Sequence, residues 1–230
     1  YTEGKTGMRQ AIEHLIKEHN KTKIGFVSGR KENADAKERL ETYKQVLKEN
    51  NIPYDGNKVV YGDFSEFTEN IVHDLLDRNP DLEAIAFAND QMAIGGYTAI
   101  KARGLEIGKD ILVVGYDNSP ASIVLEPMLT TVHNQIMDMG YHSVYEAINL
   151  INTGSTSMSV LNSSLIVRSS CGCSDFNLLK IADSNATFGK TEDIYEEIAK
   201  INKYLFKDYT DAFYYNELIL KFNPLLKLIL

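Results

Sequence analysis

The chain has 230 residues, of which 43% are hydrophobic and 24% are charged, and its formal net charge is -8 at pH 7. These values are typical of a soluble globular protein with a sizeable core. The negative charge disfavours a nucleic-acid surface, which needs a basic stripe, and no apolar run is as long as a membrane span, so we expect neither as a direct partner of this chain.

Apolar spacing predicts helices and strands in alternation. The predicted helices cover residues 7–19, 33–50, 66–78, 90–102 and 137–151, and the predicted strands cover residues 23–30, 58–61, 84–88, 111–116, 129–132 and 165–168. Strands that alternate with helices form parallel sheets with right-handed crossovers. The expected fold class is therefore α/β, with an open, doubly wound parallel sheet.

The stretch from Ala84 to Gly95 reads as a buried strand that runs straight into a helix, with Asn89 and Asp90 at the joint. Asp90 is the expected helix cap, because its carboxylate can accept from the free amides of the first turn. Such a joint places polar side chains at the carboxyl end of a parallel strand, where open α/β sheets bind their ligands.

The other predicted strands also end in polar groups. These residues are Ser28 and Arg30, Asp63, Asn89 and Asp90, and Asp117 and Asn118, with Phe64 beside them as an apolar face for stacking. Carboxylates, amides and a guanidinium suit a polyhydroxylated or heterocyclic small molecule. Asp and Asn also terminate strands and cap helices without any ligand. The pattern alone leaves both interpretations open.

Three segments, Ala88–Gly95, Asp110–Asn118 and Leu129–Val132, resemble in order and spacing the effector-binding core of LacI/GalR-type regulators, which have a type I periplasmic-binding-protein fold. Glu38-Arg39-Leu40 is similar to an Arg-Leu pair of that family, although Thr42 stands where the family usually has glycine. The resemblance runs from about Gly7 to Arg168.

The resemblance implies which residues bind the effector, typically a sugar or a nucleobase. Arg39, Asn89 and Asp117 occupy binding positions, Phe64 falls where some relatives place a stacking aromatic, and Asn134 faces the cleft from the hinge return. These five residues form the predicted ligand-binding set. No catalytic residue and no cofactor are expected, since no nucleophile motif is present.

The family has two lobes, and its N-terminal lobe is largely missing from this sequence. We therefore expect residues 1–20 to be a remnant of that lobe, 21–135 to be the C-terminal ligand-binding lobe, 136–170 to be the hinge return with a helix and the last strand, and 171–230 to be a helical tail or linker. Residues 175–190 read as irregular, and residues 191–230 read as a helix with a heptad-like seam at Ile194, Ile198, Ile201 and Leu205. Both ends look cut, so a DNA-binding or signalling domain is expected elsewhere in a longer chain.

The predicted function is a non-enzymatic, cytoplasmic, homodimeric sensor of a sugar or nucleoside-like effector, in a bacterial transcriptional regulator or signalling protein. Ligand-driven lobe closure would be relayed to the output. Two alternatives stay open: an extracytoplasmic sugar-binding protein of a transporter, and a degenerate module that dimerises without binding a ligand.

The two cysteines, Cys171 and Cys173, lie one residue apart, which favours a reducing compartment over a disulfide framework. No second pair of metal ligands is close to them in sequence, so we expect two ordinary thiols rather than zinc. His14 and His19 do not share a helix face at a spacing of four, and neither is expected to be a ligand. The sequence thus predicts no metal site.

Overall fold

The computed structural model describes residues 2–155, 157 and 160–173. The chain divides into two units, residues 1–176 and 177–230, and all described residues belong to the first. The predicted irregular stretch at 175–190, and the predicted helix with its heptad-like seam, lie outside the described residues.

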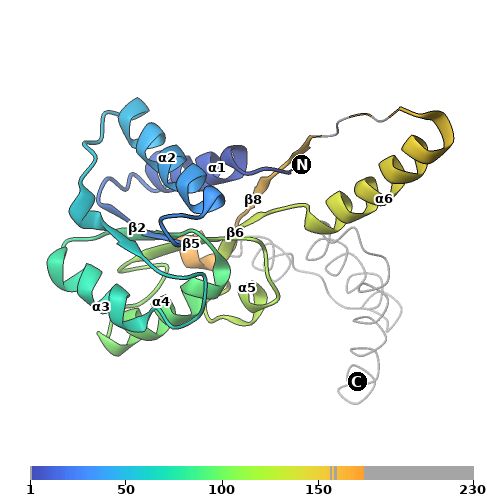
Figure 1. The fold of residues 1–230 in the computed structure, drawn as a ribbon. Helices are drawn as coiled ribbons and strands as arrows, with labels where there is room; N and C mark the ends of the chain where they lie inside the picture. Colours follow the sequence, from blue (N-terminus) through green and yellow to red (C-terminus); the bar gives the residue numbers. More distant parts are fainter. Residues whose placement is uncertain (1, 156, 158–159, 174–230) are drawn as a thin grey trace, which may run out of the picture. The chain divides into compact units, whose positions relative to one another are not determined.

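A six-stranded sheet organises the described part of the chain, in the order β3-β2-β4-β5-β6-β8 (Figure 1). Its strands are β2 (Ile24–Ser28), β3 (Val59–Tyr61), β4 (Ala84–Phe87), β5 (Leu112–Tyr116), β6 (Thr130–His133) and β8 (Ser164–Ile166). The first five strands in this order are parallel, whereas β8 pairs antiparallel with β6. The predicted α/β class with a doubly wound parallel sheet is confirmed, and β8 adds an antiparallel edge strand of the kind common in doubly wound folds.

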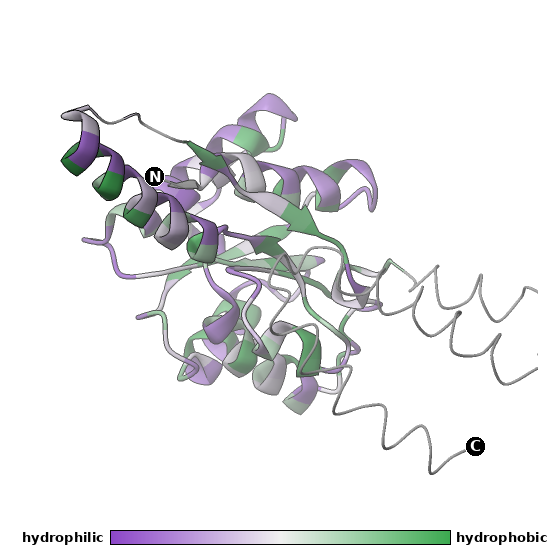
Figure 2. Ribbon diagram, turned by 90° about the vertical axis from the view of Figure 1, so that its right-hand side faces the viewer, coloured by the Kyte–Doolittle hydropathy of each residue, from purple (hydrophilic) through white to green (hydrophobic). Residues whose placement is uncertain are grey.

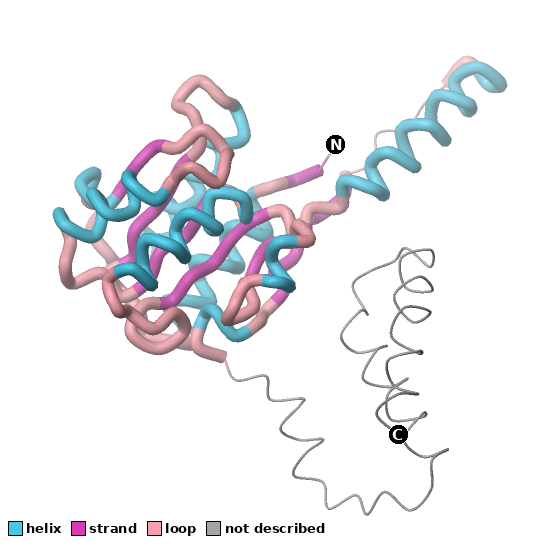
Figure 3. The backbone as a smooth tube through the Cα atoms, turned by 90° about the horizontal axis from the view of Figure 1, so that it is seen from below, coloured by secondary structure: helices cyan, strands magenta, loops and turns pink. Residues whose placement is uncertain are grey.

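Helices cover both faces of the sheet. In Figure 1, α1 (Lys5–Lys17) and α2 (Ala34–Glu49) lie on one face, and α3 (Glu69–Arg78) and α4 (Asp90–Ala102) lie on the other. Figure 3, drawn from below, shows helices across the parallel strands. The remaining elements are short: α5 (Ala121–Val124), the 3-10 turns η1 (Gly56–Lys58) and η2 (Ser169–Cys171), and a parallel pair of β1 (Thr2–Glu3) with β7 (Leu161–Asn162).

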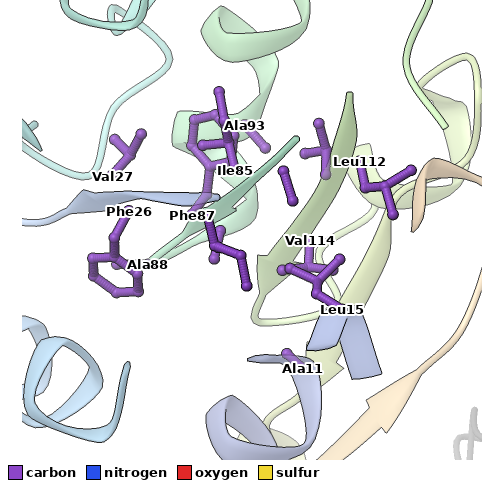
Figure 4. Close-up of a cluster of buried hydrophobic side chains, with 14 of the residues drawn as sticks. Ala11, Leu15, Phe26, Val27, Ile85, Phe87, Ala88, Ala93, Leu112 and Val114 are labelled. Atoms are coloured by element: carbon purple, nitrogen blue, oxygen red, sulfur yellow. The ribbon is translucent and has the colours of Figure 1, made fainter. Parts of the chain in front are cut away.

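The core lies between these helix layers and the sheet (Figure 4). Every residue of β2, β4 and β5 is buried, as expected for strands that are covered on both faces. Phe26 and Phe87 are fully buried, and Ala11 and Leu15 of α1 are fully buried as well. Nearly continuous apolar strands of this kind fix the sheet in the centre of the unit.

The helix α1 packs into the same core as the sheet. Its buried side chains, Met8, Ala11, Ile12 and Leu15, belong to the same core cluster as the sheet, and α1 packs against α2, β6 and β8. This packing favours α1 as part of the described lobe over the predicted remnant of another lobe. The apolar face of this helix is buried by the sheet that follows it, which the sequence pattern of one helix does not show.

The helix α6 (Ile136–Thr153) extends away from the sheet (Figures 1 and 3). It ends at Thr153, two residues beyond the predicted end at residue 151, and Gly154, whose φ is 70°, forms a left-handed cap. None of its residues is buried, and it exposes large apolar side chains that include Met137, Tyr141, Val144 and Ile151. Figure 2 shows hydrophobic positions along this helix. Among the described residues, no helix combines the length and the hydropathy needed to cross a bilayer.

Candidate ligand-binding site

The carboxyl ends of the five parallel strands lie along one edge of the sheet. The last residues of these strands are Ser28, Tyr61, Phe87, Tyr116 and His133, and the register of the strands brings their ends side by side. The structure thus confirms that the polar residues after β2, β4 and β5 share one edge. In an open α/β sheet this edge is where ligands bind.

Arg39 is the central cation of this edge. It projects from α2, and only 7% of the residue is exposed. Its Nη1 donates to the carbonyl oxygen of Ala88 at 2.5 Å, and its Nη2 lies 3.9 Å from Oδ1 of Asp117. The guanidinium carbon sits 3.7 Å from the centre of the Tyr116 ring, a cation–π contact. Two of the predicted residues, Arg39 and Asp117, are therefore neighbours, and the Tyr116 ring that contacts Arg39 was not among the predicted residues.

Asp117 follows β5 in a conformation that few non-glycine residues adopt, with a φ of 104°. Its backbone N–H donates to the carbonyl oxygen of Val132 at 2.8 Å, which fixes this turn against β6. Burial raises the pKa of Asp117 to about 6, and the Arg39 guanidinium opposes that shift. Phe64 and Asn118 also have a positive φ, 72° and 51°. Left-handed non-glycine residues cost energy, and they often cluster at functional sites.

Asn89 caps the helix that follows β4. Its Oδ1 accepts from the backbone N–H of Met92 at 3.0 Å, and its Nδ2 donates to the carbonyl oxygen of Phe64 at 3.1 Å. The ring of Phe64 packs over Gly29, where a Cβ atom would lie 2.0 Å from the ring. Asn89 thus holds the loop that carries the predicted stacking aromatic, and only glycine at position 29 leaves room for the ring.

Asp90 is not the helix cap that the sequence predicts, because Asn89 takes that place and Asp90 is the first residue of α4. The Asp90 carboxylate points into the core instead, and the residue is fully buried. It accepts from the Thr131 hydroxyl at 2.5 Å and from the Ser119 N–H at 2.7 Å. Burial raises its pKa to about 7. Asp90 therefore ties α4 to β6 and to the loop after β5.

We predict that Asn89→Ala lowers the free energy of unfolding by roughly 1 to 2 kcal/mol, because the variant loses both a helix cap and the bond to the Phe64 carbonyl. The matched control is Asn33→Ala, since Asn33 caps α2 through its bond to the Ala36 N–H. Urea unfolding of both variants measures the difference. Equal losses would show that the bond to the Phe64 loop contributes nothing.

Three buried polar side-chain atoms in the described part of the chain have no hydrogen-bond partner: Ser28 Oγ, Ser119 Oγ and Asn134 Oδ1. Ser28 ends β2, Ser119 follows β5, and Asn134 follows β6, so all three belong to the carboxyl edge. A buried polar atom without a partner costs on the order of 1 to 3 kcal/mol. This edge therefore holds hydrogen-bonding capacity that the protein itself does not use.

Ser28 also lines a cavity of about 200 Å³, together with Lys31, Ala36, Lys37, Leu40 and Tyr61. None of the five predicted ligand-binding residues lines this cavity. Arg30 and Asp63 are largely exposed, 3.9 Å apart at their closest polar atoms, and take no part in the buried groups of the edge. Arg168, which sequence reasoning did not single out, donates from Nη2 to Oδ1 of Asn118 at 2.7 Å and orients that amide.

A doubly wound α/β lobe with a partly unsatisfied polar carboxyl edge defines the class: a ligand-binding lobe of the periplasmic-binding-protein type. The family model for the periplasmic binding protein-like domain matches residues 12–171, and the chain belongs to this family, in its LacI/GalR-type form.

Three relatives show the extent of the match. The transcriptional regulator CelR of Thermobifida fusca is 33% identical over 168 residues, which cover 71% of this chain and 49% of CelR. The solved CelR–cellobiose complex has a TM-score of 0.68 at 31% identity and covers 74% of this chain and 53% of that one. The Lac repressor dimer bound to operator and an anti-inducer has a TM-score of 0.68 at 29% identity, covering 75% and 52%. The chain spans about half the length of these relatives.

The structure corrects the sequence view of the two cysteines. Cys171 and Cys173 lie next to His14 and His19, with the four ligand atoms all within 4.8 Å of one another. The two pairs are more than 150 residues apart in sequence, so the absence of a second pair near the cysteines in sequence did not reveal that the fold brings the histidines to them.

Proposed function

We propose that this domain binds a small polyhydroxylated effector, of the sugar class, and reports its presence to an output domain of a transcriptional regulator. The observation that carries the proposal is the set of unpartnered polar atoms on Ser28, Ser119 and Asn134, which belong to the same carboxyl edge of the sheet as the Arg39–Asp117 pair. Hydroxyl groups both donate and accept, so a sugar can satisfy these atoms. The cellobiose complex of the related CelR supports the same chemical class.

Each of the five predicted residues has a place in this proposal. The Arg39 guanidinium donates to ring or hydroxyl oxygens, and the Asp117 carboxylate accepts from hydroxyls. The Phe64 ring offers an apolar face for a sugar ring, and Asn89 holds the loop of Phe64 in position. Asn134 contributes its unpartnered carbonyl oxygen.

The proposed mechanism is hinge closure around the effector. The carboxyl edge described here supplies one wall, and a second lobe supplies the other. The match to only about half of the length of CelR supports a cleft that is shared with further sequence. An effector that contacts both walls favours the closed state by its differential contacts, and the output domain responds to that shift. We further propose a cytoplasmic, non-enzymatic and homodimeric protein, in line with the related Lac repressor dimer.

The test is isothermal titration calorimetry of the full-length parent protein against a panel of sugars and nucleosides that includes cellobiose. Asp117→Ala is expected to weaken the binding of the hit roughly 10- to 100-fold, because charge-assisted hydrogen bonds contribute about 1.5 to 3 kcal/mol each. Asp81→Ala is the matched control, since Asp81 is an exposed carboxylate that precedes β4, at the opposite end of that strand. Equal affinity of both variants would refute the site.

A second candidate, a module that dimerises without binding an effector, is favoured by the exposed apolar side chains of α6. Analytical ultracentrifugation of Val144→Asp separates the two functions. The module without an effector is supported if Val144→Asp is monomeric and no compound of the panel gives a calorimetric signal. Binding of a sugar from the panel would exclude it.

A further inference from the structure

The cluster of His14, His19, Cys171 and Cys173 lies apart from the carboxyl edge. His14 is on α1, and His19 follows that helix before β2 begins. Cys171 ends η2, whose Ser170 donates from its N–H to the Met128 carbonyl just before β6. The cluster therefore sits near the amino ends of the strands, at the opposite side of the sheet from the proposed effector.

Four of the six distances between the ligand atoms are close to those of a tetrahedral site, and the other two are at most 4.8 Å. His14 Nε2 lies 3.2 Å from His19 Nε2, 3.3 Å from Cys171 Sγ and 3.5 Å from Cys173 Sγ, and Cys173 Sγ lies 3.4 Å from His19 Nε2. With Zn–N bonds of about 2.0 Å and Zn–S bonds of about 2.3 Å, a tetrahedral zinc ion separates two nitrogens by about 3.3 Å and nitrogen from sulfur by about 3.5 Å.

Hydrogen bonds alone do not account for this packing. A ring nitrogen of histidine carries either one N–H or one lone pair, yet Nε2 of His14 faces three donor or acceptor atoms at 3.2 to 3.5 Å. In a tetrahedral metal site each ligand atom is flanked by the other three. The geometry therefore matches a shared central ion better than a set of pairwise bonds.

The local sequence also suits a metal site. His14 and His19 are separated by four residues, within the His spacing of zinc sites. Cys171 and Cys173 are separated by only one residue, a shorter spacing than in typical zinc sites, and Gly172 between them allows the chain to turn sharply enough. Gly172 has a φ of 87°, and a Cβ atom there would lie 2.9 Å from the carbonyl oxygen of Gly108, so the sharp turn between the two thiols requires glycine.

We propose that His14, His19, Cys171 and Cys173 bind one zinc ion in a closed, tetrahedral, structural site. Two imidazole nitrogens and two thiolates are a donor set typical of zinc. Four protein ligands leave no open position for a substrate, which excludes a catalytic role for the ion. The ion would fasten residues 171–173, where the described part of the chain ends, to the first helix of the lobe.

The test uses the full 230-residue chain, purified without a polyhistidine tag and kept in a metal-free reducing agent. Elemental analysis is expected to find about one zinc per chain, and addition of cobalt to the zinc-free protein is expected to produce the intense visible and sulfur-to-cobalt charge-transfer bands of a tetrahedral thiolate site. The chain has only two cysteines, so sulfur-ligated cobalt must come from this cluster.

The variants Cys173→Ser and His19→Ala are expected to lose stoichiometric zinc and to weaken or lose the cobalt bands, while circular dichroism shows that each remains folded. Both positions are only partly buried, unlike Cys171. The matched control is His142→Ala on α6, which should retain one zinc. The proposal is overturned if the reduced wild-type chain binds neither metal, or if both folded variants bind zinc as tightly as the control.

Discussion

Replacing Arg39 by methionine is expected to lower the free energy of unfolding by roughly 2 to 4 kcal/mol at pH 7. Methionine keeps an unbranched apolar side chain but removes the guanidinium that lies over the Tyr116 ring, donates to the Ala88 carbonyl and faces Asp117. The loss falls toward the lower end of the range for breaking a buried ion pair, because the Asp117 side chain is 31% exposed and water screens part of the charge. Urea unfolding followed by circular dichroism measures it.

A double-mutant cycle measures the interaction energy between Arg39 and Asp117. Asp117→Asn removes the carboxylate charge, so the double variant Arg39→Met with Asp117→Asn no longer leaves an unpaired carboxylate in a half-buried turn. The sum of the losses in the free energy of unfolding of the two single variants is expected to exceed the loss of the double variant by roughly 1 kcal/mol or more. Losses that simply add would show that the 3.9 Å approach of Arg39 to Asp117 carries no coupling energy.

Asp90 is expected to make the protein less stable as the pH rises from about 4 to about 7. Folding raises the pKa of Asp90 from 3.8 to about 7, because the carboxyl group is fully buried. Between these values the folded state holds a proton that the unfolded state has lost, so the free energy of unfolding falls with pH, by on the order of 4 kcal/mol in total. Above about pH 7 both states are ionised, and this contribution no longer changes.

The variant Asp90→Asn tests this expectation, because its amide resembles the protonated acid. It can donate to the Thr131 hydroxyl oxygen and accept from the Ser119 N–H, so both contacts of Asp90 have a counterpart. Unfolding curves measured at pH 4.5 and pH 7.5 give the free energy of unfolding of both proteins. As the pH rises, this free energy should increase in the variant relative to the wild type, and at pH 7.5 the variant should be the more stable protein. A constant difference between the two proteins would mean that Asp90 does not titrate in this range.

The joint at Asn89 and Asp90 shows how far local sequence goes. The pattern from Ala84 to Gly95 correctly predicts a buried strand, a helix and a polar joint at the carboxyl edge. It does not tell which of two adjacent cap-forming residues caps the helix. That choice depends on Thr131 and Ser119, which lie 41 and 29 residues away and draw the Asp90 carboxylate inward.

The same limit applies to the candidate site. The resemblance to the LacI/GalR-type family, carried by three segments, names Arg39 and Asp117 as binding residues, and the structure brings them within 3.9 Å. The Tyr116 ring that supports Arg39 gave no signal, because an aromatic residue at a strand end reads as ordinary core. The unpartnered atoms of Ser28, Ser119 and Asn134 become visible only when their surroundings are known.

Local sequence patterns establish the order of helices and strands, the parallel core of the sheet and the edge at which polar side chains collect. These features follow from apolar periodicity and turn residues, which act over one element at a time. Three features become visible only in the folded chain: α1 packs against α2, β6 and β8, β8 runs antiparallel to β6, and His14 and His19 lie beside Cys171 and Cys173. These contacts join residues far apart in the chain, and their pairing is set by how the layers pack, which no local pattern records.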